Sequence, residues 1–340
     1  MQEFAPDIAG RLNIQTKQAI AVLDLLEEGS TIPFIARYRK DRTGALDEVL
    51  IQKIQDEAKS LKEFKERKEF ISKTITDQGK MTESLTAKIN KATTLAELED
   101  IYLPYKPKRK TKAQTARENG LEPLAQMIFE QKNFDLVSEA SKYVNEKVKT
   151  SEEALQGSRD IIAELISEDA NLRASLRKLF ETKANLISKL VPAKESEGAK
   201  FKDYFEYSEQ VSKVPSHRAL AVLRGFVEGV LRISIEPEEE LAIELMERAF
   251  LKSKNSAGEQ VQKAIKDSYK RLLQPGLESE FRADLKQRSD EEAINVFAEN
   301  LRQLLLSSPL GNKRVLAIDP GYRTGCKTVC LDEKGDLIFT

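Results

Sequence analysis

The sequence predicts a mainly α, elongated and multi-lobed protein that ends in a short β segment. Charged residues make up 33% of its 340 residues and aromatic residues only 6%, with no tryptophan. This composition suits an extended helical protein better than a compact β protein. Apolar residues recur at helical spacings along most of the chain, and the period changes only in the stretch 314–340. The length allows two or three domains with a substantial core.

Composition also limits the functional class. The formal net charge is −1, so any affinity for nucleic acid must come from local patches and not from a global field. The two cysteines do not make a disulfide framework. The N-terminal residues lack the basic and apolar regions of a signal peptide, and no apolar run approaches the ~18 residues of a membrane span. We therefore expect a soluble, cytoplasmic protein without a membrane partner.

The first 48 residues predict two helical segments. Apolar residues recur at spacings of three to five from Asp7 to Glu28, and Gly29 then supplies a stop. In the next segment Pro33 stands where a first helical turn accepts proline. This segment is rich in cations, and we interpret it as a buried apolar face with a solvated basic edge. The apolar residues are Phe34, Ile35 and Tyr38, and the cations are Arg37, Arg39, Lys40 and Arg42.

A long amphipathic helix is predicted at 47–77. Its apolar stripe repeats at a spacing near 3.5 residues, and Lys/Glu pairs fill the outer face. The sequence Gln78-Gly79-Lys80 ends it. A short helix is expected at 82–91, and Thr94 with Glu97 forms a capping box for the next helix.

The stretch from Lys106 to Arg117 is the best candidate for nucleic-acid binding. Pro104 and Pro107 predict extended backbone, because proline disfavours the α region in the residue before it. Tyr102 and Tyr105 adjoin the stretch. It contains six cations and no acid: Lys106, Lys108, Arg109, Lys110, Lys112 and Arg117.

Such a basic arm offers charge for phosphates, and the tyrosines offer rings for base stacking, so its predicted partner is RNA, or else DNA. The alternative is a solvated connector whose cations pair with the nearby acids Glu97, Glu99 and Asp100. Asn119-Gly120 then predicts a helix stop, and Pro123 begins a further helix.

Short helices are expected from about 123 to 190, followed by a loop at 191–199 that is also a possible sub-boundary. The aromatic residues of 201–207 are expected to anchor a core, and a strand is expected at 231–235. Later helices are expected to follow at 238–252, at 258–273 and at 290–306. A capping box of Ser289 and Glu292 opens the last of them, and residues 307–311 form the best domain boundary.

Histidine and cysteine give little sign of catalysis. His217 is the one histidine, and we interpret it as a structural residue next to Ser216, which is expected to cap a helix. Cys326 and Cys330 lie four residues apart on an expected strand, with too few other thiols or imidazoles for a zinc or iron–sulfur site. We interpret them as small core residues. No cofactor or metal is predicted.

The last 27 residues change to strand periodicity. Apolar runs are expected to form strands at 315–318, 327–331 and 337–339, with turns between them. Asp319 follows the first strand, a position that can present a metal ligand. The other acids of the segment lie at the turn 332–336, at the far end of the adjoining strand. One carboxylate is too few for two-metal chemistry, so the alternative for Asp319 is a turn residue that bonds its own backbone.

Neither a GxxxxGK[ST] nor a GxGxxG motif occurs in the sequence, which argues against P-loop or Rossmann nucleotide binding.

Four stretches carry a resemblance to a known family: TIPFIARYRKDRTGALDE (31–48), LEDIYLPYKPKRKTKAQTARENGLEPLA (98–125), VPSHRALAVLRGFVEGVL (214–231) and VLAIDPGYRTGCK (315–327). The chain resembles the bacterial Tex proteins, which are transcription accessory factors. The resemblance implies a helical N-terminal region with a helix-turn-helix-like part, then a YqgF domain of RNase H-like fold, helix-hairpin-helix elements and an S1 RNA-binding domain. It places Asp319 at the first metal-binding carboxylate of RuvC-like resolvases.

Together these observations predict a Tex-like helical region at 1–311 and the beginning of an RNase H-like domain at 312–340, with helix-hairpin-helix and S1 absent. The expected function is that of a transcription-associated, nucleic-acid-associated scaffold that is not an enzyme in this form, with the transcription machinery as the partner that the resemblance implies. The alternative is a metal- or nucleotide-dependent phosphoryl-transfer enzyme, of the RuvC-like nuclease or actin-like ATPase class, whose catalytic half is missing from this chain.

Overall fold

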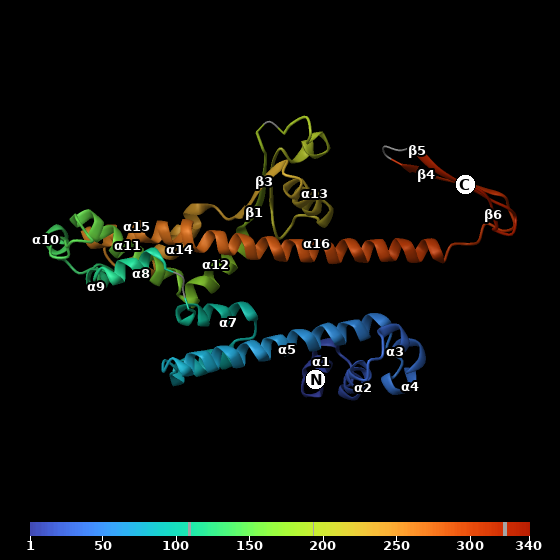
Figure 1. Cartoon of the computed structure of the whole chain (residues 1–340), viewed down its shortest axis with the longest axis horizontal. Helices are drawn as coiled ribbons and strands as arrows, with labels where there is room; N and C mark the ends of the chain where they lie inside the picture. The colour runs from blue at the N-terminus through green and yellow to red at the C-terminus, as the bar shows by residue number, and fades with distance from the viewer. Residues whose placement is uncertain (108–109, 193, 322–324) are drawn as a thin grey trace. The chain divides into compact units, whose positions relative to one another are not determined.

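A computed structural model describes residues 1–107, 110–192, 194–321 and 325–340. It confirms a mainly α protein with a short C-terminal β segment (Figure 1). The chain divides into two compact units. Unit 1 contains Met1–Asn185 and Ile235–Phe281, and unit 2 contains Leu186–Ser234 and Arg282–Thr340. The domain boundary predicted at 311/312 stays a prediction.

The first core of unit 1 is built by helices at the N-terminal end of the chain. Its most buried members include Ile8, Leu23 and Ile35, and the first half of the long helix α5 closes it. The helices are α1 (Ala5–Leu12), α2 (Thr16–Glu27), α3 (Ile32–Tyr38), α4 (Lys40–Thr43) and α5 (Glu48–Asp77), after a short 3₁₀ turn, η1 (Gln2–Phe4).

Two predictions for this region are wrong in part. The helix expected from Asp7 to Glu28 is two helices, because Asn13 adopts a left-handed conformation (φ 53°) that ends α1. Of the expected buried face, only Ile35 is buried. Phe34 and Tyr38 are exposed, and the Arg39 guanidinium lies 4.8 Å from the centroid of the Phe34 ring.

The second core of unit 1 forms on the other half of α5, where Ile71 and Ile75 pack against α6 (Glu83–Lys91) and α7 (Leu95–Tyr102). The predicted ends of these helices are confirmed. Asp47 caps α5 through its side chain, and Thr94 with Glu97 forms the capping box of α7.

The rest of unit 1 is a helical assembly around α11. Gly157 lies where α11 meets α8: a Cβ atom there would lie 3.3 Å from Ala116 Cβ and 2.3 Å from Leu121 Cδ1, so a larger residue would force the Leu121 side chain to move. The elements are α8 (Lys112–Glu118), α9 (Glu122–Glu130), α10 (Leu136–Ser141), α11 (Ser151–Ser167), α12 (Ala170–Lys183), α14 (Glu239–Phe250), α15 (Ser256–Asp267) and a π-helical turn, η4 (Ser268–Leu273).

A buried ion cluster joins α7 to α12. Asp100 is 4% exposed and accepts from Arg173 Nε at 2.5 Å and from Arg177 Nη2 at 3.1 Å. Arg177 Nε also donates to Glu280 at 2.5 Å. Paired charges of this kind hold elements together because removing one partner leaves the other buried and uncompensated. We call these four residues the Asp100 cluster.

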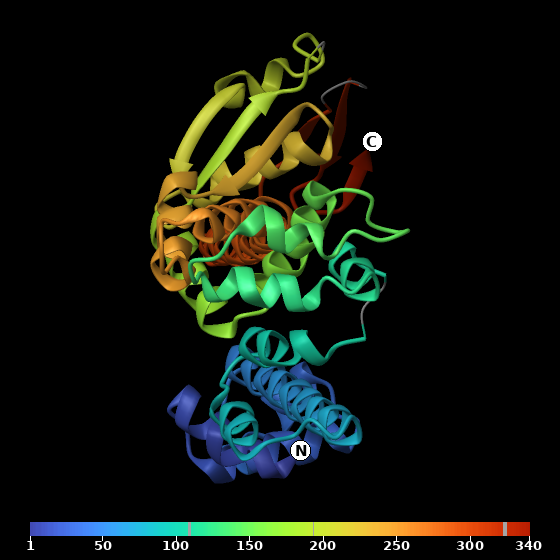
Figure 2. The ribbon, with the colours of Figure 1, turned by 90° about the vertical axis from the view of Figure 1, so that its left-hand side faces the viewer.

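Unit 2 contains a three-stranded sheet of order β2-β1-β3. Figure 2 shows its strands side by side, with α13 (Ser216–Val227) next to them. The strand predicted at 231–235 is confirmed as β3 (Leu231–Glu236), whereas β1 (Asn185–Leu190) and β2 (Glu206–Gln210) were not predicted. Phe201, in the short 3₁₀ element η3 (Ala199–Tyr204), anchors the core as expected.

The long helix α16 (Gln274–Leu305) corrects the prediction of a helix start near residue 290. Ser289 lies in the middle of α16, fully buried, and among the described residues its hydroxyl has no hydrogen-bond partner. Glu292 instead accepts a hydrogen bond from the Ser216 hydroxyl. The prediction that Ser216 caps a helix is wrong as well, because Ser216 is the first residue of α13 and the cap position is occupied by Pro215.

The C-terminal strands are confirmed as β4 (Val315–Gly321), β5 (Gly325–Leu331) and β6 (Leu337–Phe339), which form an antiparallel sheet of order β4-β5-β6. The acidic turn is confirmed too, because the Asp332 carboxylate accepts from the amides of Lys334 and Asp336. Cys326 is exposed and Cys330 half-buried, so their assignment to a core is wrong. Residues 307–311 lie outside helix and strand, as expected.

Candidate nucleic-acid interface

The predicted basic arm begins in a 3₁₀ turn. Residues Leu103–Tyr105 form η2, so the expectation that Pro104 lies in extended backbone is wrong. The fixed φ of proline, near −65°, suits a 3₁₀ turn as well as extended chain. Lys106 is extended, with φ −66° and ψ 132°, as expected for a residue that precedes proline.

The tyrosines beside the arm do not stand free for base stacking. Tyr102 is 3% exposed and belongs to the second core, against which Tyr105 also packs. Lys108 and Arg109, two of the predicted binding residues, lie outside the described residues.

Arg117 is separated from the other cations by its partners. Its Nη1 lies 2.6 Å from Glu164 Oε2, its Nε lies 3.6 Å from Glu122, and its side chain is 26% exposed. Glu164, on α11, is buried and also accepts from the Thr111 hydroxyl at 3.0 Å. Arg117 therefore joins α8 to α11, and its guanidinium already has two carboxylate partners.

Lys106, Lys110 and Lys112 are exposed, and we call them the lysine surface. Lys110 approaches Glu118 only at 3.6 Å, with its side chain 70% exposed, a geometry worth little in water. Within the described ranges, Lys106 and Lys112 form no ion pair. These three cations remain able to meet a polyanion.

The three acids proposed as partners of the arm form hydrogen bonds or ion pairs with other groups. Glu97 caps α7, and hydrogen bonds from the amides and hydroxyl of the Thr93–Thr94 segment lower the pKa of its carboxyl. Glu99 accepts from Arg67 Nε at 2.5 Å, and Asp100 belongs to the buried ion cluster. Among the described cations of the arm, none pairs with these three acids, and the connector interpretation stays a prediction for Lys108 and Arg109, which lie outside the described residues.

A pocket of about 300 Å³ lies beside the lysine surface, between α8, α11 and the turn at Lys147-Val148. Lys112, Thr115 and Asn119 come to it from one face of α8. Asp160 lines its α11 side, where burial raises the pKa of this carboxyl and Arg271, at 3.2 Å, opposes the rise. The sequence did not reveal this pocket, because its lysines come from different segments.

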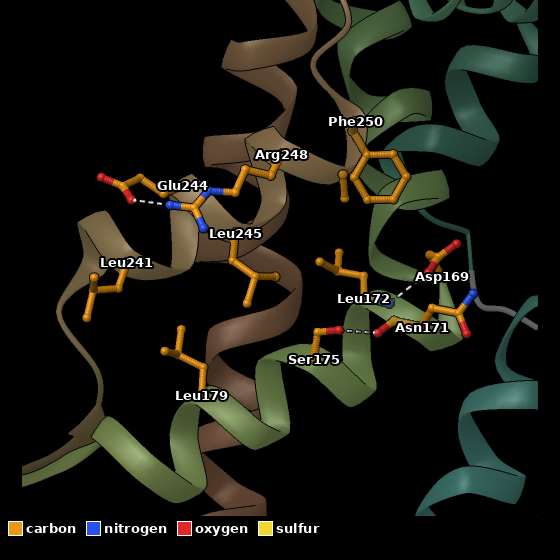
Figure 3. Close-up of a pocket in the computed structure, with 11 residues that line it drawn as sticks. Asp169, Asn171, Leu172, Ser175, Leu179, Leu241, Glu244, Leu245, Arg248 and Phe250 are labelled. Carbon is orange, nitrogen blue, oxygen red and sulfur yellow. Dashed lines mark hydrogen bonds and ion pairs between the residues drawn. The ribbon is translucent and has the colours of Figure 1, made fainter.

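A second pocket, of about 650 Å³, lies between α12 and α14 (Figure 3). Leucine side chains from both helices face it, among them Leu172, Leu179 and Leu245. Glu244 and Arg248 are paired at 3.2 Å on its α14 side. Among the described residues that line it, none was predicted from the sequence to bind a ligand.

A third pocket, of about 390 Å³, lies in unit 2 and is lined by cations together with apolar groups. Its residues are Lys200, Phe201, His217, Leu220, Ala221 and Arg224. His217 is exposed on α13. A sequence signal for this pocket exists, because the segment 211–227 contains Lys213, Arg218 and Arg224 but no acid.

Asp319 lies within a strand and not in a turn. β4 continues to Gly321, and Asp319 stands opposite Lys327 of β5 in the antiparallel register, so the interpretation as a turn residue is wrong. In the described part of the chain, no group of three or more His, Cys, Asp or Glu side chains is arranged to hold a metal ion. No helix among the described residues is long and apolar enough to span a membrane.

Two family models match the chain, "Tex-like protein N-terminal domain" over residues 2–76 and "Tex central region-like" over residues 131–297. The chain is 41% identical to protein YhgF of Escherichia coli, over 99% of the chain and 45% of that protein. It is 40% identical to the transcriptional accessory protein Tex of Neisseria gonorrhoeae, over 98% and 45%. It is 30% identical to the human S1 RNA-binding domain-containing protein 1, over 98% and 35%.

The chain thus spans about half the length, or less, of the curated relatives that it matches, and the similarity extends along nearly all of its own length. The two matched models cover the helices from α1 through nearly all of α5 and most of the chain from α10 to α16. The chain therefore belongs to the Tex family.

Proposed function

We propose that this protein is a transcription accessory factor that contacts nucleic acid through the lysine surface and acts by binding. One observation carries the proposal: in a stretch without acids, the structure leaves Lys106, Lys110 and Lys112 exposed and weakly paired, while it uses Arg117 for packing. The name of the relative from Neisseria gonorrhoeae supports the link to transcription. The name of the human relative supports RNA as the first ligand to test. A cytoplasmic location belongs to the same proposal.

The test is the salt dependence of binding to a short single-stranded RNA, measured by fluorescence anisotropy on the full chain. Each phosphate contact contributes ~0.7 to the slope of log affinity against log salt, so a triple Lys106→Gln, Lys110→Gln, Lys112→Gln variant should lose about 2 from that slope. The matched control replaces Lys53, Lys59 and Lys62, three exposed lysines of α5, by glutamine. Equal slopes for the triple variant and the wild type would refute the proposal.

The role as a scaffold without chemistry has its own test. The family resemblance connects one residue, Asp319, to metal-dependent cleavage, and this role of Asp319 stays a prediction. Incubation of labelled RNA and of branched DNA with the protein and Mg²⁺ should give no cleavage. Cleavage that is lost in Asp319→Asn would overturn the proposal in favour of the phosphoryl-transfer alternative.

A further inference from the structure

The third pocket, in unit 2, is a groove between η3 and α13. The α13 side chains that line it, His217, Leu220, Ala221 and Arg224, follow the spacing of one helix face, and η3 supplies Lys200 and Phe201 from the other side. Its volume of about 390 Å³ lies within the range of small-ligand sites. We call it the α13 groove.

Two of its cations share one carboxylate. Glu228, just after α13, lies 2.6 Å from Lys200 Nζ and 2.9 Å from Arg224 Nε. Hydrogen bonds from these two side chains lower the pKa of the Glu228 carboxyl. Arg224 is 72% exposed and Lys200 is 55% exposed, so both remain accessible from solvent. The carboxylate thus holds two cations at one end of the groove in the position where an anion would meet them.

The groove combines this cationic end with an apolar wall. Leu220 and Ala221 line it, and Phe201 supports Lys200, whose Nζ lies 5.0 Å from the centroid of the ring. This combination suits a nucleotide, because the apolar wall offers a surface for the base, and the guanidinium of Arg224 and the ammonium of Lys200 offer donors for phosphate oxygens. Arg218, the residue after His217, does not line the groove and pairs with Glu209 at 3.2 Å.

We propose that the α13 groove binds one nucleotide of a single-stranded nucleic acid, with the phosphate on Lys200 and Arg224, and that Glu228 is a built-in competitor of that phosphate. The groove and the lysine surface share no residue and belong to different compact units. This proposal therefore stands or falls independently of the one for the lysine surface.

Substitution of Glu228 distinguishes two roles for this residue. A competitor of the phosphate and a purely structural residue predict different changes in the affinity for RNA. In Glu228→Gln the carboxylate no longer competes for Lys200 and Arg224, so affinity for a short single-stranded RNA should rise about threefold. In the double variant Lys200→Gln, Arg224→Gln the affinity should fall about tenfold. If Glu228 served only to hold α13 in place, its substitution would lower the affinity or leave it unchanged, and either result would overturn the proposal.

All variants are measured on the full chain that already carries the three glutamine substitutions of the lysine surface, so that the remaining binding reports on the groove. Arg248→Gln is the matched control, because Arg248 also pairs with a glutamate one helical turn away, Glu244, but on α14. Circular dichroism and thermal unfolding check the fold of each variant. A variant with lysine in place of Arg224 (Arg224→Lys) should retain part of the affinity that is lost when Arg224 is replaced by glutamine. Inorganic phosphate should compete with the RNA in the Glu228→Gln variant; absence of competition would contradict a phosphate site at Lys200 and Arg224.

Discussion

The cations in two parts of unit 1 differ in burial and in pairing. In the Asp100 cluster, Arg173 and Arg177 are mostly buried and meet carboxylates at hydrogen-bond distance. On the lysine surface, only a few residues after Asp100 in the sequence, the cations are exposed and weakly paired. The residue types follow the same division, because a planar guanidinium satisfies two carboxylates at once, whereas an ammonium is strongly hydrated. Buried arginine stabilises the fold, and exposed lysine is the group that we propose to meet a partner.

The strongest way to break this comparison is to remove Asp100. Asp100→Ala leaves Arg173 and Arg177 without their shared carboxylate inside the protein, which typically costs about 3–5 kcal/mol of unfolding free energy. Urea denaturation followed by circular dichroism measures the loss. Glu244→Ala, which removes an exposed pair on α14, is the control and should change stability by less than about 0.5 kcal/mol. Similar losses for the two variants would show that burial of the Asp100 cluster has no energetic consequence.

Arg117 sharpens the comparison within a single helix, because it shares α8 with Lys112. Arg117→Ala removes a hydrogen bond to the buried Glu164 and should cost roughly 1–3 kcal/mol of stability. The affinity of the folded variant for RNA should stay at the wild-type value. A loss of affinity as large as that of the lysine variant, measured below the unfolding temperature, would return Arg117 to the binding surface.

The sequence was sufficient where local rules decide the structure. The extent of α5, the capping box of Thr94 and Glu97, and the three C-terminal strands were all predicted, because each depends on residues close together in the chain. The Ser289 and Glu292 pattern failed for a tertiary reason. Ser289 is buried within α16 and Glu292 binds Ser216, so contacts distant in sequence decide what the pattern means.

The candidate site shows the same limit. The stretch 106–117 was recognised by its charge, but the exclusion of Arg117 depends on Glu164, 47 residues further along the chain. The α13 groove was missed although its segment has no acid, because the second wall comes from η3 and only the fold brings Lys200 beside Arg224. Charge patterns locate a basic segment, whereas the distances to carboxylates decide which of its cations are available.

The smallest expected effect is at Asp160. This carboxylate pairs with Arg271, as the charges of the Asp100 cluster pair with each other, and it also lines the pocket beside Lys112 of the lysine surface. Burial raises the pKa of its carboxyl more than Arg271 lowers it. A raised pKa in the folded state means that this group favours folding at low pH, and that the benefit disappears as the pH rises through the folded-state pKa. Asp160→Asn should therefore be slightly more stable than the wild type at neutral pH. The difference should vanish below the ordinary pKa of aspartate, and thermal unfolding between pH 3 and pH 8 measures it. A variant that is less stable at neutral pH would show that the ion pair with Arg271 outweighs the cost of burial. Asp160 would then stabilise the fold as the Asp100 cluster is expected to do.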